Sequence, residues 1–214
     1  MNSLKKYLLL IILLVGNNAM AVDEPDYIVL KEIDDVEIRQ YGSMIIAETI
    51  ILNMDSRDSA SSEGFRRLFA YISGDNRLSE EIDMTAPVIQ SNNQQSKGEK
   101  IAMTAPVQQT AIENGWLVAF VLPENYEIDT APQPDDERIV IKEIPGRVVA
   151  VKRFSGRWKD RNITKNEELM MNTLNQVNVE TIGEIQFAAY NAPFALPFLR
   201  RNEVMVELKN MSGL

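Results

Sequence analysis

The sequence predicts a single α+β domain of two pseudo-repeated halves. Segments rich in β-branched residues, several of them alternating apolar with polar residues, recur from residue 27 to residue 208. Two other stretches, beginning near residues 58 and 162, show the 3.6-residue period of an amphipathic helix. The order strand, helix, further strands occurs twice, and the 214 residues are enough for one sizeable core. We therefore expect one domain with an internal duplication rather than two domains.

The first 21 residues are predicted to be a cleaved secretory signal peptide. Lys5 and Lys6 precede an apolar run over residues 8–15, and the small-residue pattern Ala19-Met20-Ala21 follows. The run is far shorter than the roughly 20 residues of a membrane-spanning helix. Because no cysteine follows to carry a lipid, we expect cleavage after Ala21 rather than a stable membrane anchor. Residues 22–214 would then fold in a bacterial periplasm or outside the cell.

Composition excludes several classes of function. Loss of Lys5 and Lys6 with the leader takes the formal net charge from −9 to −11, so nucleic acid and anionic lipid surfaces are not expected partners. The chain has no cysteine and no histidine. Disulfides, thiolate chemistry, an imidazole base, a Ser-His-Asp triad and histidine metal ligands are therefore excluded. We expect a protein that is not an enzyme.

The first half is predicted to begin with three strands, over residues 27–33, 36–41 and 44–52, with a turn at Asp34-Asp35. A helix follows, in which Phe65, Leu68, Phe69 and Ile72 lie at i, i+3, i+4 and i+7 on one apolar face. The segment 58–62 offers N-cap residues, and Gly74 supplies a stop.

A repeated heptamer, IxMTAPV, begins at Ile82 and again at Ile101. Its apolar residues alternate with period two, which predicts a strand in each copy. A further strand is expected over 116–122. The acidic, proline-bearing stretch 123–136 reads as a surface connection.

The second half is expected to follow the same plan. Strands over 139–144 and 147–154 flank Pro145-Gly146, and a helix covers 162–177. Thr164 is the candidate cap of that helix, and Met170, Leu174 and Val177 form its inner side. Two last strands, over 184–190 and 203–208, are joined by the unusually apolar loop NAPFALPFLRR.

Several segments together resemble one known family, namely YIVLKEIDDVEIRQY, FRRLFAYISGDN, the tandem IDMTAPV and IAMTAPV, VAFVLP, IPGRVVAVKRFSG and YNAPFALPFLRRNEV. Along nearly its whole mature length the chain is similar to the SOUL haem-binding protein family. The resemblance implies a distorted antiparallel β-barrel with two flanking helices, distantly related to gyrase-inhibitor-like domains. It also implies an exported small-molecule-binding protein whose ligand is planar, apolar and anionic, with haem or another tetrapyrrole as the candidate cofactor.

Two features depart from this family pattern or leave alternatives open. The chain carries a leader, and it lacks histidine, so imidazole ligation of haem cannot carry over. A protein-interaction or envelope-maintenance module on the same fold is the alternative function. An enzyme that modifies tetrapyrroles is the least favoured.

Met84 and Met103 occupy equivalent positions in the two heptamers. Thioether ligation of haem iron or a soft metal is one interpretation. Packing in the core is favoured over it, because each methionine lies on an alternating apolar face and methionine fills core gaps readily.

The candidate ligand-binding residues lie on the first helix and in the late apolar loop. Arg66 and Arg67 either grip ligand carboxylates or form an exposed helix face. Tyr71 either ligates ferric iron as a phenolate or packs with its hydroxyl in water. The loop either folds under as cover for the core or forms one wall of a ligand cleft, with two arginines adding anion contacts, and the cleft is favoured: Phe194, Leu196, Phe198, Arg200 and Arg201. Adjacent acids such as Asp135-Asp136 and Glu167-Glu168 are expected to be solvated.

Overall fold

The computed structural model describes residues 24–54, 56–77, 107–112, 115–191 and 195–209. They form a nine-stranded antiparallel sheet and two helices, which confirms the α+β prediction. Along the sheet the order is β1-β2-β7-β9-β8-β4-β5-β3-β6. The bounds are β1 (Tyr27–Ile33), β2 (Val36–Tyr41), β3 (Met44–Leu52), α2 (Arg57–Ile72), β4 (Val107–Ile112), β5 (Gly115–Val121), β6 (Ile139–Ile144), β7 (Arg147–Phe154), α3 (Asp160–Gln176), β8 (Thr181–Ala189), η1 (Pro197–Leu199) and β9 (Asn202–Leu208).

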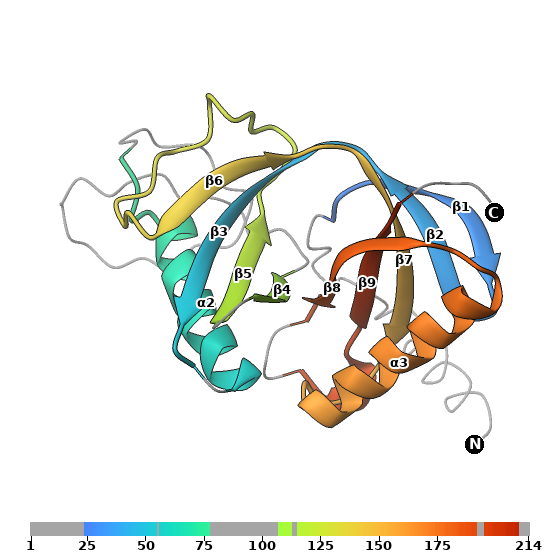
Figure 1. The fold of residues 1–214 in the computed structure, drawn as a ribbon. Coiled ribbons are helices and arrows are strands. Elements are labelled where there is room, and N and C mark those ends of the chain that lie inside the picture. Colours follow the sequence, from blue (N-terminus) through green and yellow to red (C-terminus); the bar gives the residue numbers. More distant parts are fainter. Residues whose placement is uncertain (1–23, 55, 78–106, 113–114, 192–194, 210–214) are drawn as a thin grey trace, which may run out of the picture.

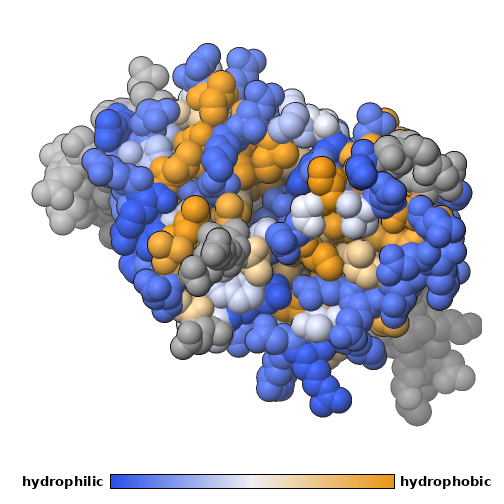
Figure 2. Space-filling model, viewed as in Figure 1, coloured by the Kyte–Doolittle hydropathy of each residue, from blue (hydrophilic) through white to orange (hydrophobic). Residues whose placement is uncertain are grey.

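The sheet curls into an open, distorted half-barrel, and each helix packs on one part of it (Figure 1). Helix α2 lies against β3 and β5, and α3 lies against β7 and β9. Within the described residues β1 and β6 form the two edges of the sheet. In the same view hydrophobic residues gather mainly over the half that carries α2, while the surface over α3 is mostly hydrophilic (Figure 2).

Helix α2 approaches the sheet closely because of a glycine. A Cβ on Gly64 would lie 2.6 Å from Cγ2 of Val118 on β5, so only glycine permits this separation. Leu68 and Ile72 are buried as predicted, but Phe69 is about half exposed and stacks on Phe65. Ser56 is the N-cap of this helix, ahead of the expected segment 58–62, because its side chain accepts a hydrogen bond from the backbone of the third helical residue.

Helix α3 buries Ile163, Met170 and Leu174 against the second part of the sheet. The predicted cap Thr164 is wrong, since the helix already begins at Asp160 and Thr164 lies inside it with its side chain exposed. Val177 is also not part of the inner side. It follows the last helical residue, where the chain turns away, and its side chain is exposed.

Strand β4 was not predicted from the sequence. Of the two heptamers only Val107 lies in the described residues, where it begins β4 and pairs with both β5 and β8. The pairing of β4 with β8 joins the α2 half of the sheet to the α3 half. The β conformation of the heptamers and the internal duplication stay predictions.

The acidic pairs of the sequence lie mostly at the surface. Asp34-Asp35 forms the turn between β1 and β2, with Asp34 in the left-handed region at φ 53°. Asp136 and Glu167 are partly buried and form ion pairs with arginines, and burial raises the pKa of the Glu167 carboxyl. In the described part of the chain, none of the helices has the length and apolar character needed to cross a bilayer.

Candidate ligand-binding site

The segment between β8 and β9 is described from residue 195, and hydrogen bonds fix its backbone against the residues that precede α3. The amide of Leu199 donates to Leu196 O over 2.9 Å, which closes η1. The amide of Gly156 donates to Pro197 O, also over 2.9 Å. Trp158 Nε1 donates to the side chain of Asn202, the first residue of β9, over 2.7 Å, so η1 and the start of β9 are both tied to residues 156–158. Figure 1 shows this segment beside the first turn of α3.

Three large apolar side chains project from this fixed segment. Leu196 is 56% exposed, Phe198 is 70% exposed and Leu199 is 67% exposed. We call these three residues the apolar tip. Exposed apolar side chains on a rigid backbone mark a binding surface, because their exposure to water is unfavourable until a partner covers them. The three side chains of the apolar tip therefore do not cover the core, and they are available to a ligand.

The two arginines that end the segment point to different surroundings. The Arg200 guanidinium lies 4.7 Å from the centre of the Trp158 ring, and its Nε donates to Ala195 O. Arg201 turns to the barrel side, where it stacks over Tyr190 and binds Glu24 and Glu203. Arg200 thus borders the apolar tip, whereas Arg201 is held by acidic partners of the chain itself.

Arg201 belongs to a buried ionic network that the sequence did not reveal. Glu203 is fully buried and accepts hydrogen bonds from Arg39 Nη1 at 3.0 Å, Arg201 Nε at 3.0 Å and the Tyr190 hydroxyl at 2.7 Å. Burial disfavours the Arg39 cation, but the Glu203 carboxylate outweighs this and raises the pKa of Arg39. Burial, together with Glu203, also raises the pKa of the Tyr190 hydroxyl. The network ties β2 to β9 and anchors the end of the loop.

The predicted residues of α2 divide between surface and interior. Arg66 is 74% exposed and pairs with Glu63. Arg67 is largely buried, where Nη1 donates to Thr49 Oγ1 and Nη2 to Glu63. Tyr71 is fully buried and its hydroxyl donates to Pro132 O over 2.8 Å. To ligate iron, Tyr71 would have to give up this bond and leave the core.

The candidate residues of α2 also lie far from the candidate residues of the loop between β8 and β9. Arg57, at the start of α2, contacts Asp160 and Glu167 of α3, so the beginnings of both helices meet near the loop. Arg66 lies roughly 14 Å farther along the helix axis, at 1.5 Å per residue. The structure therefore brings Leu196, Phe198 and Arg200 together at the start of α3 but leaves Arg66 and its neighbours apart from that place. Phe194, Met84 and Met103 lie outside the described residues.

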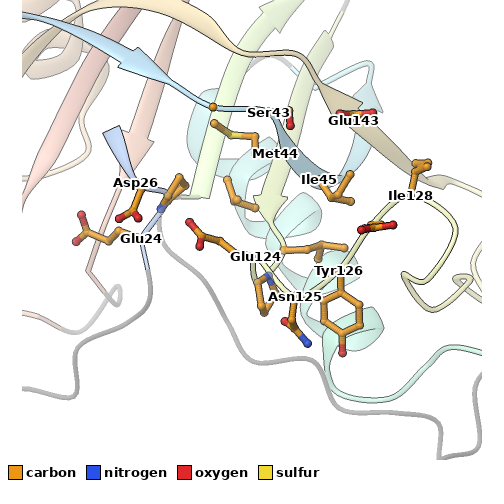
Figure 3. Close-up of a pocket in the computed structure, with 16 residues that line it drawn as sticks. Glu24, Asp26, Ser43, Met44, Ile45, Glu124, Asn125, Tyr126, Ile128 and Glu143 are labelled. Atoms are coloured by element: carbon orange, nitrogen blue, oxygen red, sulfur yellow. The ribbon is translucent and has the colours of Figure 1, made fainter. Parts of the chain in front are cut away.

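A cavity of about 980 Å³ opens elsewhere, between the start of β1 and the connection that follows β5. Apolar side chains such as Met44 and Ile45 line it together with five carboxylates, most of which Figure 3 labels and which give the acid-rimmed cavity its name: Glu24, Asp26, Glu124, Glu127 and Glu143. Of the described residues that line it, none is a lysine or an arginine. Nor do the described residues hold any group of three or more acidic side chains placed to bind a metal ion.

Haem presents an apolar macrocycle and two propionate groups, and the two surfaces differ in their fit to it. The acid-rimmed cavity would repel the propionates. The apolar tip offers exposed hydrophobic side chains beside the Arg200 cation, which is the combination that an apolar dicarboxylate requires. Strong axial ligands are scarce, because the chain has neither histidine nor cysteine. The residues present therefore fit haem through apolar burial and charge rather than through imidazole or thiolate ligation.

Comparison with known proteins agrees with this fold and this chemistry. The family model described as "SOUL heme-binding protein" matches residues 22–207. "Heme-binding protein 2" of Mus musculus is 28% identical over 91% of this chain and 90% of its own length. The Homo sapiens protein of the same name is 29% identical over 81% and 78%. The crystal structure of the EcmrR C-terminal domain shares the fold, with a TM-score of 0.52 at 7% identity over 82% of this chain and 97% of that domain. The chain belongs to the SOUL heme-binding protein family.

Proposed function

We propose that the chain binds haem or a related tetrapyrrole on the surface formed by the apolar tip and the start of α3. The observation that carries this proposal is the exposure of Leu196, Phe198 and Leu199 on a backbone fixed by hydrogen bonds. A macrocycle laid on these side chains removes them from water without requiring the loop to rearrange, so little ordering entropy opposes binding. The names of the mouse and human relatives support the same ligand class.

The proposed role is binding without chemical change to the ligand. Apolar burial supplies most of the affinity, and cations near the tip meet the propionates. The lack of histidine and cysteine argues for weak or absent axial ligation and leaves no imidazole to act as an acid or base near neutral pH. Export by the leader over residues 1–21 belongs to the same proposal, with the periplasm or the exterior as the place of action.

The test is a titration of residues 22–214 with hemin, followed in the Soret band. We expect saturable binding of one hemin per chain, and an unchanged absorption spectrum of the bound pigment after a reductant is added and removed. Phe198→Ser should weaken binding roughly 10- to 100-fold, because about 1.5–3 kcal/mol of apolar burial is lost. Ile182→Ser, an equally apolar exposed position on β8, is the matched control and should leave affinity unchanged. A wild-type titration without saturable change would refute the proposal.

One observation favours a second function, a protein-interaction module. The strand β1 exposes three consecutive apolar side chains, Ile28, Val29 and Leu30, and its outer edge pairs with no other strand of the described residues. Edge strands of this kind pair with strands of other chains unless something covers them. Analytical ultracentrifugation of the wild type and of Val29→Lys tests this function. Self-association that the lysine abolishes would support it, and a monomer with no change would count against pairing between copies.

A further inference from the structure

The cations of this acidic protein that form no ion pair are unevenly distributed over its described surface. Most lysines and arginines of the described ranges form ion pairs with acidic side chains, and Arg200 stacks on Trp158. The exposed cations outside such pairs are Lys31 on β1 and a group that falls within the short stretch 153–165: Arg153, Arg157, Lys159, Arg161 and Lys165. A net charge of −9 therefore coexists with one locally basic region.

This region adjoins the apolar tip. On either side of Arg157, Gly156 hydrogen-bonds to Pro197 of the loop that carries the tip, and Trp158 hydrogen-bonds to Asn202, where β9 begins directly after that loop. Lys159 is the N-cap of α3, and Arg161 and Lys165 follow at i, i+4 on one exposed stripe of the helix. We call Arg157, Lys159, Arg161 and Lys165 the basic surface.

Two of the three acidic residues of α3 near the basic surface bind an arginine of α2, and the third, Glu168, lies exposed at i+3 from Lys165. Asp160 and Glu167 of α3 both bind Arg57 of α2, at 3.2 and 3.5 Å. The positive end of the α3 dipole adds to the local field at the start of the helix. Within the described residues Arg157, Lys159 and Arg161 thus form no ion pair and lie next to exposed apolar side chains, which is an arrangement complementary to an amphipathic anion.

We infer that the basic surface at the start of α3 binds the carboxylates of the ligand whose apolar body covers the tip. The inference rests on the proposed function and adds to it the residues that recognise charge. It assigns this role to α3 and the residues before it, and not to Arg66 and Arg67 of α2, because Arg66 and Arg67 already bind Glu63.

The test compares hemin with hemin dimethyl ester, which keeps the macrocycle and lacks both charges. The variant is Arg157→Gln/Lys159→Gln/Arg161→Gln in residues 22–214. Its control, Lys31→Gln/Arg77→Gln/Lys209→Gln, makes the same change in net charge at exposed cations elsewhere. The first variant should lose about 5- to 30-fold in affinity for hemin, as expected for two exposed charge contacts. Its affinity for the ester should change less than about 2-fold. The control should match the wild type for both ligands, and added salt should weaken hemin binding only.

Each failure has a distinct meaning. If neither hemin nor the ester binds the wild type, the proposed function fails and this inference fails with it. If both bind but the variant keeps its hemin affinity, or loses both ligands equally, the carboxylate role is refuted while tetrapyrrole binding stands. A last experiment measures the binding of the wild type and the first variant to vesicles that contain phosphatidylserine. Vesicle binding that the variant loses, with hemin affinity unchanged, would overturn the inference and assign the basic surface to anionic lipid.

Discussion

Replacing the buried carboxylate at the centre of the ionic network should destabilise the whole domain. Glu203→Gln keeps the shape of the side chain but removes its charge and turns one acceptor into a donor that faces donors. Arg39, which is almost fully buried, then loses its main counter-charge and retains only Glu37. Breaking a buried ion pair by removing one partner typically costs about 3–5 kcal/mol, because the other charge remains desolvated.

The expected loss is large enough to measure by thermal unfolding. For a domain of this size each kcal/mol lowers Tm by about 2–4 °C, so Glu203→Gln should lower it by roughly 6–20 °C. Glu37→Gln is the control, since Glu37 is partly exposed and offers Arg39 Nε a single contact of 2.7 Å. That variant should cost no more than about 1 kcal/mol.

Two outcomes would contradict this reasoning. Equal effects of the two substitutions would mean that burial of Glu203 does not decide the energetics. A fall in Tm of less than about 2 °C for Glu203→Gln would mean that the network does not hold β2 to β9. The double variant Arg39→Met/Glu203→Leu should be less destabilised than Glu203→Gln, because both buried charges are then gone.

Three further substitutions test separate contacts. Gly64→Ala should destabilise the domain by about 1–2 kcal/mol, since overpacking against Val118 exceeds the gain in helix propensity, and Val118→Ala in the same chain should relieve part of the loss. Arg138 donates hydrogen bonds to the Asp136 carboxylate and lowers the pKa of that carboxyl to about 2. The ionised carboxylate therefore stabilises the fold fully above about pH 4, and this stabilisation is lost as the pH falls through about 2. Asp136→Asn should remove this part of the pH dependence, at most about 1 kcal/mol, in acid titrations followed by circular dichroism. Trp158→Phe removes the hydrogen bond from Trp158 to Asn202, which contributes about 1 kcal/mol. The loss should speed hydrogen exchange at the Gly156 amide, which donates to Pro197 of the loop. Unchanged exchange would mean that the bond does not hold the loop.

Local signals predicted most strands because turn residues separate them clearly. The bounds of β1, β2, β3, β6 and β7 match the expected ranges, each flanked by a turn signal such as Asp34-Asp35 or Pro145-Gly146. Strand β4 was not predicted because it contains Gln108 and Gln109, polar residues that usually lie at the surface but are buried in this structure. The pairings of β2 with β7 and of β3 with β6 join distant parts of the chain, and no local pattern announces them.

The sequence indicated the apolar residues of the candidate site but not which of its charged side chains are free of ion pairs. The apolar loop stands out in the sequence, but the structure was needed to show that Leu196, Phe198 and Leu199 are exposed rather than packed under the loop. Which arginines are available cannot be read locally, since Arg67 is buried and paired while Arg157 is exposed and unpaired. Arg39 and Glu203 lie on β2 and β9, which are far apart in the sequence, and each has other charged residues nearby in its own strand or just before it, so no local pattern pointed to the network.

The most direct test of ligand binding at the tip is paramagnetic broadening in the amide NMR spectrum of residues 22–214 titrated with ferric hemin. Ferric iron broadens the resonances of the amides closest to it. Binding at the proposed surface predicts that signals of residues 156–161, 196 and 198–200 disappear first, while those of residues 66–71 and 124–128 persist. Broadening that begins at residues 66–71 or around the acid-rimmed cavity, with the tip unaffected, would contradict the proposed site.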